Sequence, residues 1–163
     1  MDEYWDIYDK NRRFQNRTIL RGTPFKEGDY YVSCEVWIQN FKGELLITLR
    51  NPNKKAGGLW EFVGDGVLAG ETTAQAAIRE VKEEIGLDIT EAELTYLYEY
   101  RCKNYFMDIY SVNKDVDIKD VVLDLAEATD AKWVTKEELQ NLIDSGEFVR
   151  SVALRYNLLK DEL

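Results

Sequence analysis

The sequence contains no histidine, two cysteines and two prolines among its 163 residues. Without histidine, no mechanism that needs imidazole as a base or as a metal ligand is available. Cys34 and Cys102 are too few for a disulfide framework and form no CxxC pair, so we expect two buried, reduced thiols. No apolar run approaches the roughly 20 residues that span a bilayer.

The two ends of the chain bear on the cellular location of the protein. The N-terminus, Met1–Asp6, is acidic and lacks the apolar region of a signal peptide. The last four residues, Lys160–Leu163, spell the ER-retention signal, which a receptor reads only in a protein that has entered the secretory route. We interpret that match as chance and expect a cytoplasmic protein.

Positive charge is also scarce, because 21 Lys and Arg face 31 Asp and Glu, for a formal net charge of −10. Such a surface repels nucleic-acid backbones and anionic membranes, so we expect neither a nucleic acid polymer nor a membrane as partner. An acidic protein can still act on phosphate groups when metal ions supply the positive charge. With 45% hydrophobic residues and no visible linker, the chain predicts a single globular domain over residues 1–163.

The pattern of apolar residues predicts a mixed α/β fold. Strands are expected at 4–8, 18–21, 30–39, 44–50, 93–103, 105–113 and 130–134, and helices at 72–85, 136–144 and 149–159. Strands 30–39 and 44–50 are expected to form a hairpin. The buried stripe of the first helix is expected at residues with helical spacing: Ala74, Ala77, Ile78, Val81 and Ile85. This order of elements predicts a mixed sheet between helices.

Three glutamates of the first helix carry the strongest chemical signal. Glu80, Glu83 and Glu84 are spaced i, i+3, i+4, which predicts that they project from one helix face. Like charges at this spacing destabilise an isolated helix. Hard divalent cations such as Mg²⁺ or Mn²⁺ are the natural partners of clustered carboxylates, so the pattern predicts a metal site.

The residues around these glutamates fit the same interpretation. Gly64, Gly66 and Gly70 permit tight turns that place backbone groups near a ligand. Glu71 is expected near the helix start, where negative charge is favourable. Arg79 can reach neighbouring carboxylates and orient them through hydrogen bonds.

The spacing resembles the Nudix box, Gx5Ex7REUxEExGU with U aliphatic. The matching residues are Glu71, Arg79, Glu80, Val81, Glu83, Glu84, Gly86 and Leu87. The resemblance implies the Nudix α/β/α sandwich with a mixed central sheet, in which residues 1–28 are lead-in strands and residues 64–87 are the loop and helix. It also implies an Mg²⁺- or Mn²⁺-dependent hydrolase that cleaves a diphosphate linkage in a nucleoside diphosphate derivative or related small molecule, with a homodimer as a possible assembly.

The resemblance assigns roles to individual residues. The implied metal ligands are three helical carboxylates and one backbone carbonyl: Glu80, Glu84, Glu83 and Gly64. Glu83 is a further ligand or holds a water, and Arg79 with Glu71 is the orienting pair. A general base is expected outside the box, at Glu127 in the acidic loop before Trp133, with Glu99 as the second choice.

One position departs from the family pattern, and two alternative functions follow. The first glycine of the box falls at Asp65, where a glycine usually serves a turn with φ > 0. If the Asp65 carboxylate crowds the diphosphate, the chain is a non-catalytic nucleotide-binding module. Residues 5–11 also resemble the lead-in of isopentenyl-diphosphate isomerases, so an isoprenoid-diphosphate isomerase-like enzyme is the second alternative, which the absence of histidine disfavours.

Basic and aromatic residues near the box are weaker candidates for substrate contacts. Arg50, Lys54 and Lys55 flank the loop before the box and could meet a phosphate, although surface residues of this kind are common. Trp37 or Tyr31 could stack on a base, but packing in the core or at an interface is the simpler interpretation.

Overall fold

The computed structural model describes residues 1–163 and contains eight strands and three α-helices. The strands are β1 (Tyr4–Tyr8), β2 (Phe14–Leu20), β3 (Tyr31–Gln39), β4 (Leu45–Arg50), β5 (Trp60–Glu61), β6 (Leu94–Arg101), β7 (Tyr105–Asn113) and β8 (Ala128–Val134). The helices are α1 (Thr73–Ile85), α2 (Lys136–Asp144) and α3 (Arg150–Leu159). None of the helices combines the length and the apolar character needed to cross a membrane.

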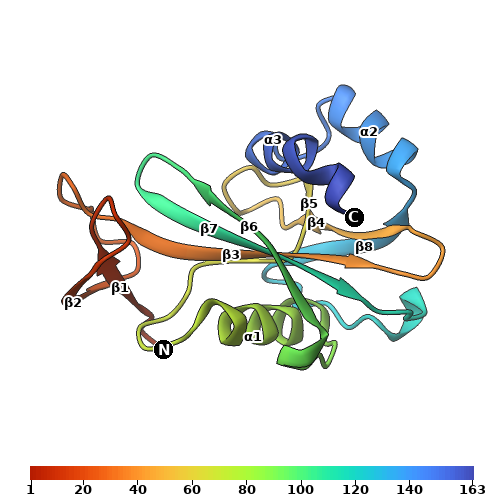
Figure 1. Ribbon diagram of the computed structural model, residues 1–163. Helices are drawn as coiled ribbons and strands as arrows, with labels where there is room; N and C mark the ends of the chain where they lie inside the picture. The colour runs from red at the N-terminus through yellow and green to blue at the C-terminus, as the bar shows by residue number, and fades with distance from the viewer.

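The central sheet is mixed and lies between helices, as predicted. Its strand order is β5-β4-β3-β7-β6, with β8 paired to β4. β3 and β7 are parallel along their whole length, and the other pairs are antiparallel. Figure 1 shows α1 below this sheet and α2 with α3 above it. The result is the expected α/β/α sandwich.

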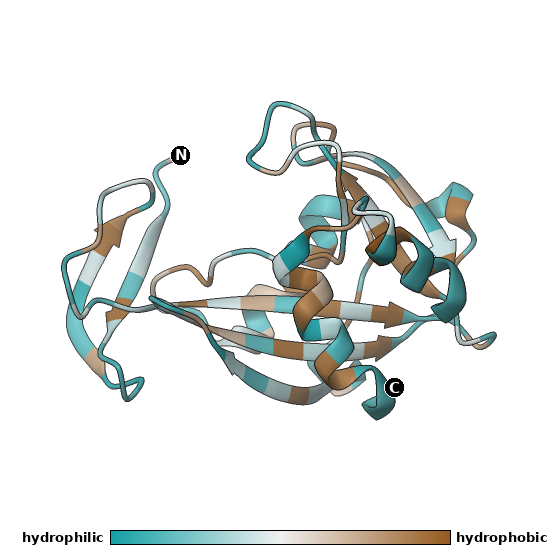
Figure 2. Ribbon diagram, turned by 90° about the horizontal axis from the view of Figure 1, so that it is seen from above, coloured by the Kyte–Doolittle hydropathy of each residue, from teal (hydrophilic) through white to brown (hydrophobic).

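Each face of the sheet has its own hydrophobic core. Alternating residues of β3, from Val32 to Ile38, face α1 and pack against its buried Ala77 and Val81. On the other face Trp37 packs with residues of α3 such as Tyr156. In Figure 2 the apolar segments of the ribbon gather in the central strands and on the helices that cover them. The two cores determine which residues of each strand and helix point into the protein and which remain available at its surface.

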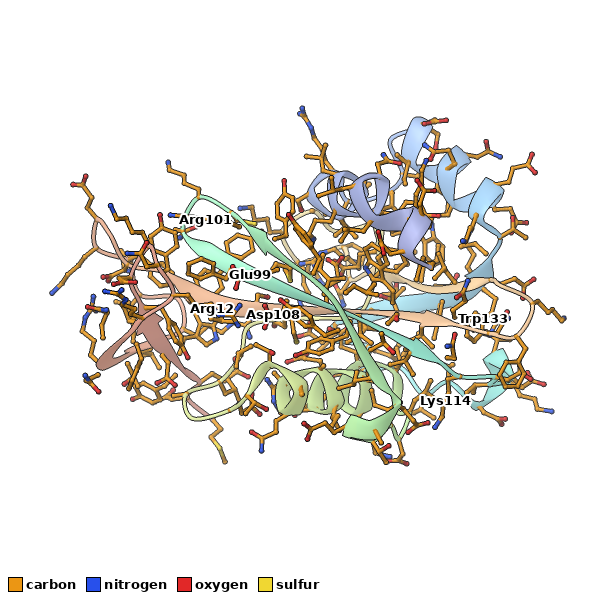
Figure 3. The ribbon with its side chains drawn as sticks, in the orientation of Figure 1. Arg12, Glu99, Arg101, Asp108, Lys114 and Trp133 are labelled. Atoms are coloured by element: carbon orange, nitrogen blue, oxygen red, sulfur yellow. The ribbon has the colours of Figure 1, made fainter.

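The N-terminal hairpin of β1 and β2 is a separate two-stranded sheet at one end of the molecule (Figures 1 and 2). Its main anchor is Arg12, whose Nη1 and Nη2 donate to the two carboxylate oxygens of buried Asp108 at 2.6 and 2.7 Å. Arg12 also contacts Glu99, so one guanidinium joins the hairpin to β6 and β7 (Figure 3). A second anchor pairs Arg21 with Asp65 at 2.6 Å.

Several structural expectations need correction. β2 begins at Phe14 and not at residue 18, and β5 is not among the strands expected from the apolar pattern. β3 and β4 share only the pair Gln39–Leu45, because β4 diverges and forms its long ladder with β8. On α1, Ala74 and Ile78 are half-buried and Ala76 is buried in their place. Ala74 and Ile78 still pack against the core on this face of the sheet, at its edge.

Candidate active site

Helix α1 begins and ends where the sequence predicts. The Thr72 side chain accepts a hydrogen bond from the Gln75 N–H, and the Gln75 side chain accepts one from the Thr72 N–H, which forms a capping box. Gly86 ends the helix with φ 72°, a left-handed conformation that glycine adopts without a Cβ penalty. These local signals set the register in which the glutamates are presented.

The three glutamates of α1 differ in their exposure to solvent. Glu80 and Glu84 lie on the buried face of α1, toward the sheet, and are 6% and 7% exposed. The side chain of Glu83 is 58% exposed. A spacing of four residues keeps Glu80 and Glu84 in one row, whereas Glu83 lies at the rim of that row.

Arg79 and Glu71, to which the resemblance assigns an orienting role, form an ion pair. Arg79 donates from Nε and Nη2 to the two Glu71 oxygens at 2.8 and 3.0 Å. The same guanidinium contacts Glu80 and, at 3.2 Å, Glu83. Glu71 in turn accepts a hydrogen bond from the Leu68 N–H at 3.0 Å, so the pair ties the glycine loop to the helix.

The buried carboxyls repel one another. Burial is the main reason that the pKa of Glu84 is raised well above its usual range, and the neighbouring Glu80, Glu61 and Asp65 raise it further. Burial raises the pKa of Glu80 to about 7. The backbone of Gly64 also lies beside the Glu84 carboxyl and acts against the shift. Acidic groups held together in a poorly solvated place are a typical feature of functional sites.

Glu61 is a further acidic residue close to Glu84, and the sequence pattern did not single it out. It lies on β5, its pKa is raised to about 7 mainly by burial, and Arg50 holds it through hydrogen bonds of 2.7 and 2.9 Å. The sequence feature that could have identified Glu61 is its position as the single acidic residue within the apolar run Leu59–Val63. Such a residue is costly to bury without a partner, so its position already indicates a role.

The donor set fits a hard divalent cation. All candidate donors are oxygens, and the mutual repulsion of Glu61, Glu80 and Glu84 is what such an ion would relieve. No three acidic or thiol groups surround a common point in the structure. Glu80 is turned toward Arg79 instead, so a change of its rotamer would accompany binding of an ion.

The environment of Asp65 corrects one expectation. Asp65 does not have a positive φ, and the unusual backbone belongs to the preceding Gly64, with φ 153°. A Cβ on Gly64 would lie 2.1 Å from the carbonyl oxygen of Cys34. Asp65 accepts a hydrogen bond from the Gly66 N–H and pairs with Arg21 of the hairpin. The position thus accommodates aspartate without backbone strain.

The other candidates lie at different distances from this cluster. Glu127 pairs with Lys54, and Lys54 is close enough to Glu61 to lower its pKa, so these residues border the site. Glu99 is engaged by Arg12 of the N-terminal hairpin. Lys55 is exposed.

Of the aromatic and thiol candidates, some are buried in the core and others lie at a cavity or near the surface. Trp37 is fully buried beside Phe62 and cannot stack on a ligand. Tyr31 stacks on Trp5 of the hairpin, with ring centroids 4.4 Å apart, and lines a cavity next to Gly64. Both cysteines are free thiols; Cys34 is buried, but Cys102 is only half-buried.

Comparison with known proteins agrees with this geometry. The sequence model of the NUDIX domain matches residues 30–154, and the chain belongs to this family. It is an enzyme of the Nudix hydrolase class, the pyrophosphohydrolases. The matched range begins after β2, so the N-terminal hairpin lies outside it.

Individual relatives extend the likeness over most of the chain. A Nudix hydrolase of Listeria innocua is 38% identical over 149 residues, which are 90% of this chain and 88% of that protein. The structure of DR0079 from Deinococcus radiodurans has a TM-score of 0.75 at 24% identity and covers 90% of this chain and 92% of the other. A bifunctional NMN adenylyltransferase/ADP ribose pyrophosphatase from Francisella tularensis, crystallised with AMP and a manganese ion, has a TM-score of 0.66 at 21% identity over 86% of this chain and 43% of that one.

Proposed function

We propose that this protein is an Mg²⁺- or Mn²⁺-dependent hydrolase of the diphosphate linkage in a nucleoside diphosphate derivative or a related small molecule. The observation that carries the proposal is the buried row of Glu80 and Glu84, bordered by Glu61 and oriented by Arg79. The family membership and the Francisella tularensis structure with AMP and manganese support the same chemistry.

Each residue of the cluster has a role in this proposal. The residues that would hold the metal are Glu80, Glu84, Glu83 and the carbonyl of Gly64, and we propose Glu61 as a further ligand because it lies close to Glu84. When bound, the metal supplies Lewis acidity toward the phosphoryl oxygens and an activated water. Arg79, fixed by Glu71, orients the Glu80 carboxylate and keeps the glycine loop against the helix.

Proton transfer is assigned to a residue outside the box. Glu127 is the proposed base, and Lys54 fixes its carboxylate at the border of the site. Exposed Glu83 is placed to hold a water at the rim. Both are carboxylates, which suits a chain that has no histidine to accept a proton.

The test is hydrolysis of a substrate panel with Mg²⁺ or Mn²⁺ present. The panel consists of nucleotide sugars, ADP-ribose, dinucleoside polyphosphates and NADH. We expect at least one of these compounds to release a nucleotide, which chromatography identifies. Glu84→Gln should lower kcat by about 10³-fold or more, because it removes a charged ligand from the reacting centre. Glu137→Gln, an exposed glutamate at the start of α2, is the matched control and should retain the parent rate.

The outcomes separate the proposal from its alternatives. Unchanged activity of Glu84→Gln would show that the site is elsewhere. Interconversion of the two C5 isoprenoid diphosphates without hydrolysis would favour the isomerase-like alternative. Nucleotide binding without turnover, with activity gained by Asp65→Gly, would favour the non-catalytic module.

A further inference from the structure

A buried ion pair lines the cavity beside the proposed metal site. Glu35 of β3 and Arg155 of α3 are 120 positions apart in the chain, and each side chain is 4% exposed. Arg155 donates from Nε to Glu35 Oε2 at 3.1 Å and also contacts this oxygen through Nη2. The other Glu35 oxygen accepts a hydrogen bond from the Trp37 indole at 2.8 Å.

A contribution to folding stability does not by itself explain why Glu35 and Arg155 are charged and buried. Removing two charges from water costs about as much as their attraction returns, and hydrophobic residues of similar volume are often at least as stabilising. The neighbours Met107 and Val152 are apolar, so an apolar pair would pack well here. A charged group held at such a cost next to a cavity indicates a binding role.

One edge of the Arg155 guanidinium remains free. Glu35 occupies Nε and one side of Nη2, whereas Nη1 has no hydrogen-bond partner in the protein. Arg155 lines a cavity of about 340 Å³ that Gly64 and Asp65 also border. The remaining donors, on Nη1 and the second hydrogen of Nη2, form a flat fork suited to two neighbouring acceptors.

The rest of the cavity suits a flat polar group. Tyr31 and Tyr105 line it and stack on each other with ring centroids 5.1 Å apart. Its volume is near the lower end for ligand sites, which is enough for one nucleoside and too little for two.

We propose that this cavity binds the base of a nucleotide substrate and that Arg155 selects bases with two adjacent acceptors, namely cytosine (O2 and N3) or guanine (O6 and N7). Adenine presents a donor beside N7, and uracil presents an N–H between its two carbonyl groups, so neither matches the fork. This inference rests on the proposed function only in that the cavity adjoins the proposed metal site.

Binding of CMP, GMP, AMP and UMP without metal tests the inference directly. Isothermal titration in EDTA is expected to show CMP or GMP binding at least about tenfold more tightly than AMP and UMP, the selectivity typical of one bidentate arginine contact. Equal affinity for all four, or binding of none, would overturn the inference. This binding experiment measures no turnover. If the protein selects bases but hydrolyses none of the substrates in the panel, only the proposed function is refuted.

A charge-neutral variant assigns the selectivity to Arg155. Arg155→Met alone leaves Glu35 buried without its partner and risks unfolding, so it is combined with Glu35→Gln, which keeps an acceptor for the Trp37 indole. The double variant should fold, as judged by circular dichroism, and bind the four nucleotides within about twofold of one another. Arg150→Met, at an exposed position of the same helix, is the control and should keep the parent preference. Unchanged selectivity in the folded double variant would overturn the role of Arg155.

Discussion

Gly64→Ala tests how closely the glycine loop must approach β3. The Cβ of alanine would lie 2.1 Å from the carbonyl oxygen of Cys34 and 2.8 Å from the Cα of Glu35. Both neighbours are backbone atoms of a central strand, so the loop must move outward by about 1 Å to reach ordinary contact. Gly64 also has φ 153°, which an L side chain adopts only with strain.

The expected cost follows from three contributions. The unfavourable φ costs about 1–3 kcal/mol, and the forced displacement costs about 1–3 kcal/mol as overpacking. Movement of the loop also weakens the hydrogen bonds from the Cys34 N–H to Asp65 at 3.0 Å and from the Val36 N–H to Val63 at 2.8 Å, each worth about 1 kcal/mol. Because these terms overlap, we expect a loss of about 3–5 kcal/mol, or roughly 10–15 °C in Tm for a chain of this size.

Gly70→Ala is the matched control in the same loop. Gly70 also has a positive φ, 81°, but no atom lies within 4 Å of its added Cβ. Only the strain of the left-handed backbone remains, so the loss should be about 1–2 kcal/mol. Thermal unfolding followed by circular dichroism in metal-free buffer compares the two, and equal Tm values would refute the close approach. Where Gly64→Ala folds, its hydrolysis rate should fall about 100-fold, since a shift of about 1 Å misplaces the reacting groups.

Three further predictions concern the metal, the hairpin and a thiol. Mg²⁺ at 100 times its Kd should stabilise the protein by about 2.7 kcal/mol in thermal unfolding, and an equal gain in Glu84→Gln would contradict the metal site. Arg12→Met should cost about 2 kcal/mol in urea unfolding, because Asp108 stays buried without its partner while Arg12 itself is partly exposed; exposed Arg13→Met is the control, and equal losses would refute the anchoring role. Burial raises the pKa of the Cys34 thiol, so a thiol reagent at pH 8 should label Cys34 only after unfolding, and rapid labelling of Cys34 in the native protein, as distinct from the half-buried Cys102, would mean that β3 opens.

Elements with local start and stop signals were predicted closely. Thr72 and Gly86 bound α1 as expected, and the observed bounds of β7 and α2 equal the predicted ones. Such signals depend on residues within one turn of each other, so they can be recognised without knowledge of the fold. The ladder of β4 with β8 was not predicted, because strand pairing at long separation depends on how the whole sheet closes.

The residues that surround the predicted site residues could not be predicted from the sequence. Glu61 and the Glu35–Arg155 pair come from separate strands and a helix, and no spacing in the sequence connects them to the box. A glycine at position 65 usually serves a turn with φ > 0, but here the positive φ belongs to Gly64, which also lies against the carbonyl of Cys34. These features arise from contacts between elements that are far apart in the chain.

The sequence by itself determined the family, the α/β class and the order of groups along the box, because fixed spacing on one helix places Arg79, Glu80 and Glu84 in register. Only the tertiary structure decided that Glu80 and Glu84 are buried while Glu83 is exposed. The physical reason is that the burial and the pKa of a carboxyl depend on which neighbours exclude water and which charges lie close to it, and for Glu84 those neighbours include Glu61 of β5 and Asp65 of the glycine loop.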